Sequence, residues 1–352
     1  GGIQEEAPSL GKPVLVKPNL VTVYHRMGLV RRSYPESSDP RVLDAAVLWL
    51  ARLASELVIV ESSGRGAPTR GSFKVAGIDR LARRRGCRLV ALDEEPVDRY
   101  LLPKASVQRE ILVPRPFSAV VRGEAAYVSL PKLKTNLYTC VTLGFKNAMG
   151  VIPYNLRQRS HHYQIDRKLV EMLYLFKPDL VLIDGVVGGE GECPAPVDPV
   201  DSRLVIAGDH AVETDRVATR LMGFEPASIE LMRVADELGF GEPGGATVLG
   251  PGGGGEPEPV AFRPADASLI SKRVRELCPS VRVLLGIPPR PERLAGPPPP
   301  PPAPGEAASP AFLAAMEASC RGGCIATTRF AFSMLEAEGI RARRPAVLIL
   351  GG

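Results

Sequence analysis

Six short apolar runs, each followed by a polar, glycine or proline cluster, dominate the hydrophobic pattern of this chain. Runs of this kind between turn signals are typical of buried strands. The six runs are Val14–Val16, Leu57–Val60, Leu89–Leu92, Ala125–Leu130, Leu180–Ile183 and Leu204–Ala207. Ligands of open α/β sheets bind beyond the carboxyl ends of the strands. The clusters that follow the six runs are therefore predicted to gather at one edge of a sheet and to form a site there.

The stretches between the runs have helical spacing. Asp39 is predicted to cap a helix that starts at Pro40 and continues over Val42–Leu57. Other helices are expected at Phe73–Arg85, Asp166–Phe176, Thr214–Leu221 and Ile229–Leu238, and an antiparallel strand within Tyr100–Val113. The alternation of strands and helices predicts parallel pairing. The fold class is therefore α/β: Rossmann-like, with a mostly parallel sheet flanked by helices.

The glycine-rich stretch Pro251–Gly255 predicts a domain boundary. Residues 1–250 are expected to form the main α/β domain, and residues 251–352 a smaller C-terminal α/β unit. This unit contains a predicted helix, two predicted strands and a proline-rich loop, at Ala267–Leu277, Val281–Leu285, Ala346–Leu350 and 287–304. The six consecutive prolines Pro297–Pro302 predict a stiff polyproline spacer.

Composition narrows the class of protein. The chain is 45% hydrophobic and 24% charged, as soluble globular proteins are. Its net charge of +5 suits a small anionic ligand as well as nucleic acid, whereas an aromatic content of only 5% weakens base stacking. No apolar run is long enough to span a bilayer, and no signal peptide is visible. The six cysteines have no disulfide-scaffold spacing, so we expect a cytoplasmic protein without membrane contact. A homo-oligomer is compatible with these features.

Lysines and amides cluster at the predicted strand ends. Ammonium and amide groups suit phosphate or carboxylate oxygens, and small hydroxyls can add hydrogen bonds. The alternative is that these lysines are solvated loop residues. The predicted substrate-binding residues are Lys17, Asn19, Ser62, Ser63, Lys132, Lys134, Lys146 and Asn147.

Histidines and carboxylates supply candidate chemistry. One of the adjacent His161 and His162 could act as general acid or base, with Asp184 as a further catalytic candidate. Imidazole and carboxylates also suit a divalent metal ion, for which Asp184, Glu190 and His162 are the predicted ligands. No metal-binding motif of known spacing supports this set, and hydrogen-bonded loop histidines are the alternative. The glycine-rich stretch Asp184–Pro194 is predicted to be a lid or a surface loop.

Two other functions stay open. Cys320 and Cys324, with Cys278 nearby in sequence, could hold a metal or act in redox chemistry, although buried structural cysteines are more common. The basic run Arg80–Arg88 could contact RNA, but it better suits a solvated helix C-terminus.

The chain resembles the DUF362 domain proteins over about residues 12–250. The segments that carry the resemblance are Val16–Leu20, Glu61–Gly64, Leu130–Thr135, Gly144–Gly150 with the histidine after it, Lys177–Leu180, Asp184–Gly185 and Gly208–Phe224. The resemblance implies an α/β unit with a shared polar site. Many members carry a ferredoxin-like segment C-x-x-C-x-x-C-x-x-x-C-P and are labelled iron–sulfur proteins. This sequence lacks that segment, so an iron–sulfur role would need Cys278, Cys320 and Cys324.

Overall fold

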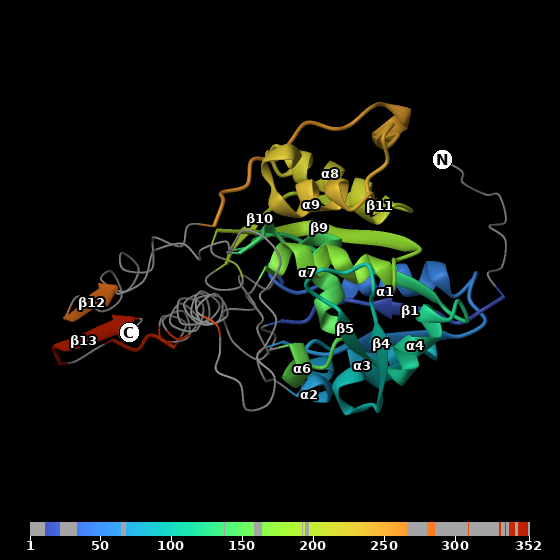
Figure 1. The fold of residues 1–352 in the computed structure, drawn as a ribbon, viewed down its shortest axis with the longest axis horizontal. Helices are drawn as coiled ribbons and strands as arrows, with labels where there is room; N and C mark the ends of the chain where they lie inside the picture. The colour runs from blue at the N-terminus through green and yellow to red at the C-terminus, as the bar shows by residue number, and fades with distance from the viewer. Residues whose placement is uncertain are drawn as a thin grey trace.

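The protein is described from a computed structural model. The residues that the structure describes are 11–21, 34–64, 68–136, 138–157, 164–191, 193, 197–265, 280–285, 309, 331, 335, 338–341 and 344–350. Their main feature is a nine-stranded sheet flanked by helices, which confirms the predicted α/β class (Figure 1).

Five parallel strands form the first part of the sheet, in the order β3-β2-β1-β6-β9. They are β1 (Val14–Lys17), β2 (Leu57–Glu61), β3 (Arg88–Ala91), β6 (Ala126–Ser129) and β9 (Leu180–Glu190). The chain leaves β1 toward β2 and β3 on one side and later adds β6 and β9 on the other. The strand order therefore reverses between β1 and β6, which is where open α/β sheets most often bind ligands.

β9 crosses the middle of the molecule and is longer than predicted (Figure 1). Its first half pairs with β6 and its second half with β7 (Lys132–Asn136), both in parallel. β8 (Cys140–Val141) pairs with β7 in the antiparallel direction. On its other side β9 pairs antiparallel with β10 (Asp198–Val200) and β11 (Leu204–Gly208).

The antiparallel direction of β11 corrects one prediction. This strand is the sixth apolar run, and its carboxyl end points away from the carboxyl ends of the other five. The cluster that follows it, Gly208 and Asp209, therefore does not belong to the predicted edge.

Helices cover both faces of the sheet. On one face, Val14 and Val16 pack with α1 (Pro40–Leu50), α2 (Thr69–Val75) and α3 (Ile78–Arg85) in one core. Asp39 caps α1 as predicted, with its side chain accepting from the backbone N–H of Arg41 at 2.8 Å. The single helix expected at Phe73–Arg85 is two helices, because Gly77 takes a positive φ of 74° between them.

The other face carries a larger core that includes Leu15, so neighbouring residues of β1 point to opposite layers. The helices that contribute to this core are α4 (Arg115–Val121), α5 (Leu143–Asn147), α7 (Ile165–Glu171), α8 (Ala211–Leu221) and α9 (Glu230–Glu237). A separate antiparallel hairpin, β4 (Val97–Leu101) and β5 (Glu110–Pro114), supplies the strand expected near Tyr100.

Two stretches predicted to be irregular are regular. The polar segment after Leu130 contains β7, β8 and α5, followed by the 3-10 helix η3 (Ala148–Val151) and the short helix α6 (Tyr154–Arg157). The glycine-rich stretch is not a lid over its described length, since β9 continues to Glu190. Its glycines permit close packing: a Cβ on Gly188 would lie 3.1 Å from the carbonyl oxygen of Leu133 and closer still to the Phe262 ring.

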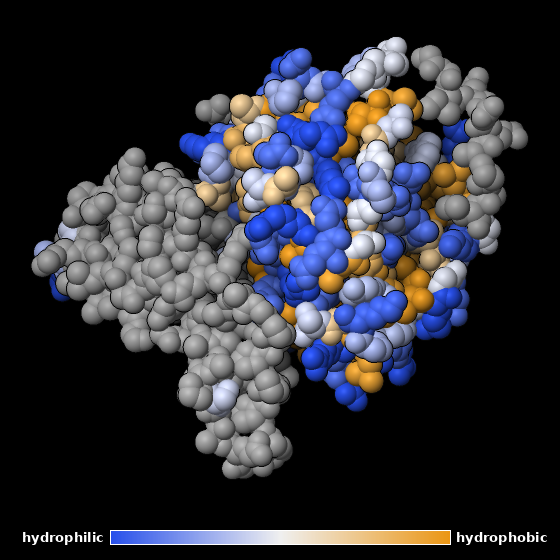
Figure 2. Space-filling view, turned by 45° about the horizontal axis from the view of Figure 1, so that its top comes forward, coloured by the Kyte–Doolittle hydropathy of each residue, from blue (hydrophilic) through white to orange (hydrophobic). Residues whose placement is uncertain are grey.

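In the C-terminal part, β12 (Val281–Leu285) and β13 (Ala346–Leu350) occur where strands were predicted and pair in parallel. The predicted helix at 267–277 and the proline-rich loop lie outside the described residues. Backbone hydrogen bonds from Val260 and Phe262 to Leu221 and Met222 tie the chain beyond residue 250 to α8. The surface seen in Figure 2 mixes hydrophilic and hydrophobic side chains.

Candidate functional site: a buried polar edge at the strand ends

Lys17, the last residue of β1, lies at the point where the strand order reverses, and its side chain is 1% exposed. Its ammonium donates to Glu61 Oε2 at 3.0 Å, to Asn147 Oδ1 at 2.9 Å and to the carbonyl oxygen of Pro18 at 2.9 Å. An ammonium has three N–H groups, so these acceptors use all of them. Burial lowers the pKa of Lys17 and raises the pKa of Glu61, and in each case the charge of the partner opposes the shift.

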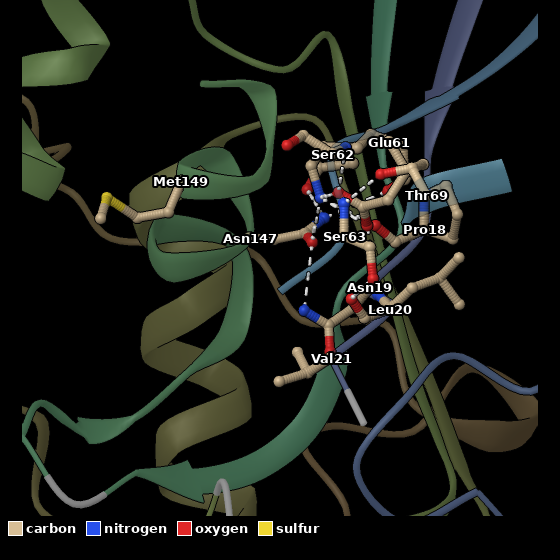
Figure 3. A network of polar contacts seen from close by, with 12 residues as sticks. Pro18, Asn19, Leu20, Val21, Glu61, Ser62, Ser63, Thr69, Asn147 and Met149 are labelled. Carbon is tan, nitrogen blue, oxygen red and sulfur yellow. Dashed lines mark hydrogen bonds and ion pairs between the residues drawn. The ribbon is translucent and has the colours of Figure 1, made fainter. Parts of the chain in front are cut away.

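Asn147, at the end of α5, bridges the ends of two strands. Its amide nitrogen donates to the backbone carbonyl of Lys17 at 3.1 Å and to Ser129 Oγ at 2.9 Å. Ser129 is the last residue of β6. Asn147 therefore fills the crevice between β1 and β6, and Figure 3 shows it beside the turn that follows β2.

Gly150, in η3, packs directly against the Lys17–Glu61 ion pair. Its carbonyl oxygen accepts from the backbone N–H of Ser62 at 2.9 Å. A Cβ at this position would lie 2.5 Å from the Lys17 Nζ, so only glycine fits without a shift. The segment from α5 through η3 thus fills the crevice between β1 and β6.

A side chain of α8 forms hydrogen bonds with the start of α5. Asp215 is fully buried, and its carboxylate accepts from the backbone N–H groups of Gly144 and Phe145, both at 2.9 Å. Burial raises the pKa of Asp215 to about 7, and the two backbone hydrogen bonds oppose this rise. The position of Asn147 therefore depends on a buried carboxyl group in a distant helix.

Lys134, on β7, joins the same network through Asn19. Its ammonium donates to Asn19 Oδ1 at 3.0 Å and to the backbone carbonyl of Glu36 at 2.7 Å. Asn19 Nδ2 in turn lies 3.5 Å from Asn147 Oδ1. We call Lys17, Asn19, Glu61, Ser129, Lys134 and Asn147 the strand-end network.

Lys132 and Asp184 form a second buried pair next to it. The Lys132 ammonium lies 2.8 Å from Asp184 Oδ2, and their side chains are 1% and 0% exposed. The same oxygen accepts from the backbone N–H of Asp39 at 2.8 Å, and Oδ1 accepts from that of Val186 at 3.2 Å. Burial lowers the pKa of Lys132, and Asp184 opposes this shift. Asp184 thus joins β9 to the start of α1.

The turn after β2 holds the two predicted serines. Ser63 donates its backbone N–H to Thr69 Oγ1 at 2.8 Å, and its hydroxyl lies 2.8 Å from Ser72 Oγ. Ser62 is 1% exposed, and its backbone N–H also contacts Glu61 Oε1 at 2.9 Å. Figure 3 shows both serines beside Glu61 and Asn147. Lys146 lies on α5 next to Asn147 and is partly exposed.

The predicted metal set receives no support from the described part of the chain. Asp184 and Glu190 lie six residues apart on β9, about 20 Å in an extended strand, so they cannot share one ion. Glu190 Oε2 accepts from the backbone N–H of Arg263 at 2.8 Å. Within the described ranges, no three His, Cys, Asp or Glu side chains form a group that could hold a metal ion.

Several predicted residues lie outside the described residues, namely His161, His162, Cys278, Cys320 and Cys324. Acid/base, redox and iron–sulfur roles for them therefore stay predictions. The basic run belongs to α3 and β3, where Arg83, Arg85 and Arg88 each pair with a carboxylate. RNA binding and oligomerisation also stay predictions.

Sequence reasoning missed two residues of this edge. Glu61 neutralises Lys17, and its place at the end of a strand run was the available signal. Arg157, at the end of α6, donates Nη1 to the carbonyl oxygen of Met149 at 3.1 Å and Nη2 to that of Ser63. It thereby fixes the turn after β2 to η3, a contact that no local pattern in the sequence indicates.

Comparisons with known proteins give a family. A family model described as "Domain of unknown function (DUF362)" matches residues 14–220. The chain is similar to a thylakoid-associated protein of Synechocystis sp., with 26% identity over 243 residues that cover 65% of this chain and 69% of the relative. No solved structure matches. No helix in the described residues is both long and apolar enough to cross a membrane, and a cytoplasmic setting stays a prediction.

Proposed function

The chain belongs to the DUF362 family, and we propose that it is an enzyme acting on a small phosphate- or carboxylate-bearing substrate at the carboxyl edge of its sheet. The observation that carries this proposal is the convergence of polar side chains from four separate strands. Lys17, Glu61, Ser129 and Lys134 come from β1, β2, β6 and β7, and Asn19 and Asn147 join them by hydrogen bonds. Burying so many polar groups costs desolvation free energy, and their position at the reversal of strand order, where open α/β sheets bind ligands, favours a function for this edge.

The buried lysines support the edge rather than contact the substrate. All three N–H groups of the Lys17 ammonium donate hydrogen bonds within the protein, and Lys132 forms a buried ion pair with Asp184. Together they hold the ends of β1, β7 and β9 in fixed positions. Substrate contacts then come from the turn after β2 and from the segment around η3, which lie over the network.

The acid/base step is assigned to His161 or His162. His161 follows Arg157 by four residues, so the covalent chain alone keeps their Cα atoms within about 14 Å. Arg157 contacts the turn after β2, so both histidines follow a residue of the edge closely in sequence. Metal chemistry at Asp184 and Glu190 is not part of the proposal, because these carboxylates are apart and already accept hydrogen bonds.

A binding test uses matched pairs of charged and neutral compounds. Glycerol 3-phosphate is compared with glycerol, and malonate with malonamide, by thermal shift and by hydrogen exchange. We expect the charged member of at least one pair to raise the melting temperature and to protect amides in 61–64 and 147–152. Protection confined to other regions, or equal effects of charged and neutral compounds, would contradict the proposal.

A turnover test follows binding. The charged compound that protects the edge is incubated with the protein and with His161→Gln and His162→Gln, and its conversion is followed by NMR. We expect one variant to lose conversion while it keeps the protection of 61–64. If both variants convert the compound like the unmodified protein, neither histidine is the acid or base.

A further inference from the structure

Arg157 differs from the other arginines whose side chains the structure describes. It is partly withdrawn from solvent, yet no carboxylate of the described residues lies within ion-pair distance of it. The other partly withdrawn arginines in this set all have a carboxylate partner: Arg85 with Asp44, Arg167 with Glu237, Arg216 with Asp236 and Arg220 with Glu256. Withdrawing a cation from water without an anion is unfavourable, so an anionic partner is expected.

The hydrogen bonds of Arg157 orient it without neutralising it. Its described acceptors are two backbone carbonyls, those of Met149 and Ser63, and its guanidinium lies 5.4 Å from the centroid of the Tyr154 ring. A guanidinium has five N–H donors in a fixed fork, and two of them are used here. The remaining donors stay available for a planar or tetrahedral oxyanion, which guanidinium groups bind with two parallel hydrogen bonds.

The charge around Arg157 is also incomplete. Lys17 and Arg157 both act on Glu61, whose single carboxylate already forms the ion pair with Lys17. Glu61 and Asp93 act on Arg157 electrostatically, but neither lies within ion-pair distance of it. An anionic ligand at Arg157 would balance the charge.

Ser62 provides an independent indication. Its hydroxyl oxygen is fully buried and has no hydrogen-bond partner among the described residues. Ser62 directly precedes Ser63, whose carbonyl oxygen Arg157 holds. A buried hydroxyl without a partner is uncommon in folded proteins. The Ser62 hydroxyl thus lies on the turn that the Arg157 guanidinium contacts from α6, and among the described residues both lack a partner of the kind that an oxyanion supplies.

We propose that Arg157 and the Ser62 hydroxyl form the oxyanion-binding point of this edge, taking a phosphate or carboxylate group of the ligand. This inference rests on the proposed function and makes it specific, because it moves the contact from the predicted lysines to an arginine. The guanidinium binds two oxygens of the anion and the hydroxyl binds one. The strand-end network holds the turn on which Ser62 lies.

The test measures binding of inorganic phosphate and of malonate by isothermal titration calorimetry. The variants are Arg157→Gln, Arg157→Lys and Ser62→Ala, and the matched control is Arg52→Gln, an exposed arginine. We expect Arg157→Gln to weaken binding about tenfold or more, Arg157→Lys to restore part of it, and Ser62→Ala to weaken it by a smaller factor. Arg52→Gln should bind like the unmodified protein. The anion bound more tightly identifies the group that the site takes.

The outcomes separate the two proposals. If the unmodified protein binds an anion and Arg157→Gln and Ser62→Ala bind it equally well, the assignment to Arg157 and Ser62 is wrong while the anion site stands. If the unmodified protein binds neither anion at millimolar concentration, the proposed function fails as well. Because Arg157→Gln removes two contacts to carbonyls, near-UV circular dichroism checks its fold. Should it unfold, retention of full binding by both Arg157→Lys and Ser62→Ala would overturn the assignment.

Discussion

Asn147 and Lys17 hold each other by two hydrogen bonds of opposite direction. The Lys17 ammonium donates to Asn147 Oδ1 at 2.9 Å, and Asn147 Nδ2 donates back to the carbonyl oxygen of Lys17 at 3.1 Å. A side chain from α5 thus satisfies both the charged group and the last backbone carbonyl of β1. No aliphatic or carboxylate side chain could do both, because the position needs an acceptor and a donor together.

Replacing Asn147 by alanine should destabilise the fold by about 2–4 kcal/mol, because it leaves a buried ammonium and a buried carbonyl short of partners. Urea denaturation followed by circular dichroism measures the change. Asn155→Ala, on an exposed position of α6, is the control and should change stability by less than about 0.5 kcal/mol. If Asn147→Ala lowers the free energy of unfolding by less than about 1 kcal/mol, as a substitution on the protein surface would, the hydrogen bonds of Asn147 are dispensable for stability.

The Lys17–Glu61 ion pair should show strong coupling in a double-mutant cycle. Lys17→Met and Glu61→Gln should each cost about 3–5 kcal/mol, since each leaves the other group buried and alone. The double variant should cost clearly less than the sum. The matched control is the exposed pair Arg99–Glu110, whose side chains are 66% and 43% exposed and whose coupling should stay below about 1 kcal/mol. Equal coupling in both cycles would contradict the buried arrangement.

Gly150→Ala should be strongly destabilising, because the new methyl group would overlap the Lys17 ammonium and the Glu61 carboxylate. We expect a loss of about 3 kcal/mol or more. Gly244→Ala is the control, since nothing lies within 4 Å of a Cβ there and its φ is not positive. Urea denaturation midpoints, compared at an unchanged m-value, measure the loss of stability of the two variants. If the two variants are equally stable, η3 does not lie over the ion pair.

Asp215 should make stability depend on pH. Burial raises the pKa of Asp215 from its ordinary value of 3.8 to about 7, so the folded protein holds this proton more tightly than the unfolded chain. Its contribution is therefore fully present below about pH 4 and is lost as the pH rises through about 7. Asp215→Asn removes this titration, so its free energy of unfolding should fall less between pH 5 and pH 8.

Asp209→Asn, at an exposed position just before α8, is the control and should keep the pH profile of the unmodified protein. Urea denaturation at a series of pH values gives the slopes. An Asp215→Asn profile parallel to that of the unmodified protein would show that Asp215 stays ionised in the folded state.

The strands were readable from the sequence wherever they are apolar on both faces. β1, β2, β6 and the first half of β9 coincide with apolar runs, because helices cover them on both sides. β7 was missed because two of its five residues are lysines, a composition typical of a surface loop. What makes it a buried strand is a set of partners from far along the chain. The Asp184 carboxylate, 52 residues from Lys132, neutralises that lysine, and the backbone carbonyl of Glu36, 98 residues from Lys134, accepts a hydrogen bond from the other.

The edge itself was predicted, but the state of its lysines was not. The positions of Lys17, Asn19 and Asn147 follow from strand ends and family motifs, and the structure joins them by hydrogen bonds. Local patterns contain no information on which acceptor lies opposite an ammonium. The direction of β11 was equally hidden, since an apolar run reads the same in parallel and antiparallel pairing.

The contact between Lys17 and Asn147 joins groups 130 residues apart, and this separation has a consequence for biosynthesis. At the usual pace of translation, about 5–20 residues per second, β1 leaves the ribosome roughly 7 to 26 seconds before the asparagine that completes it. During that interval the ammonium at the end of the nascent first strand is hydrated and has not met its partner Asn147. The N-terminal half of the sheet is thus expected to stay incomplete until α5 emerges.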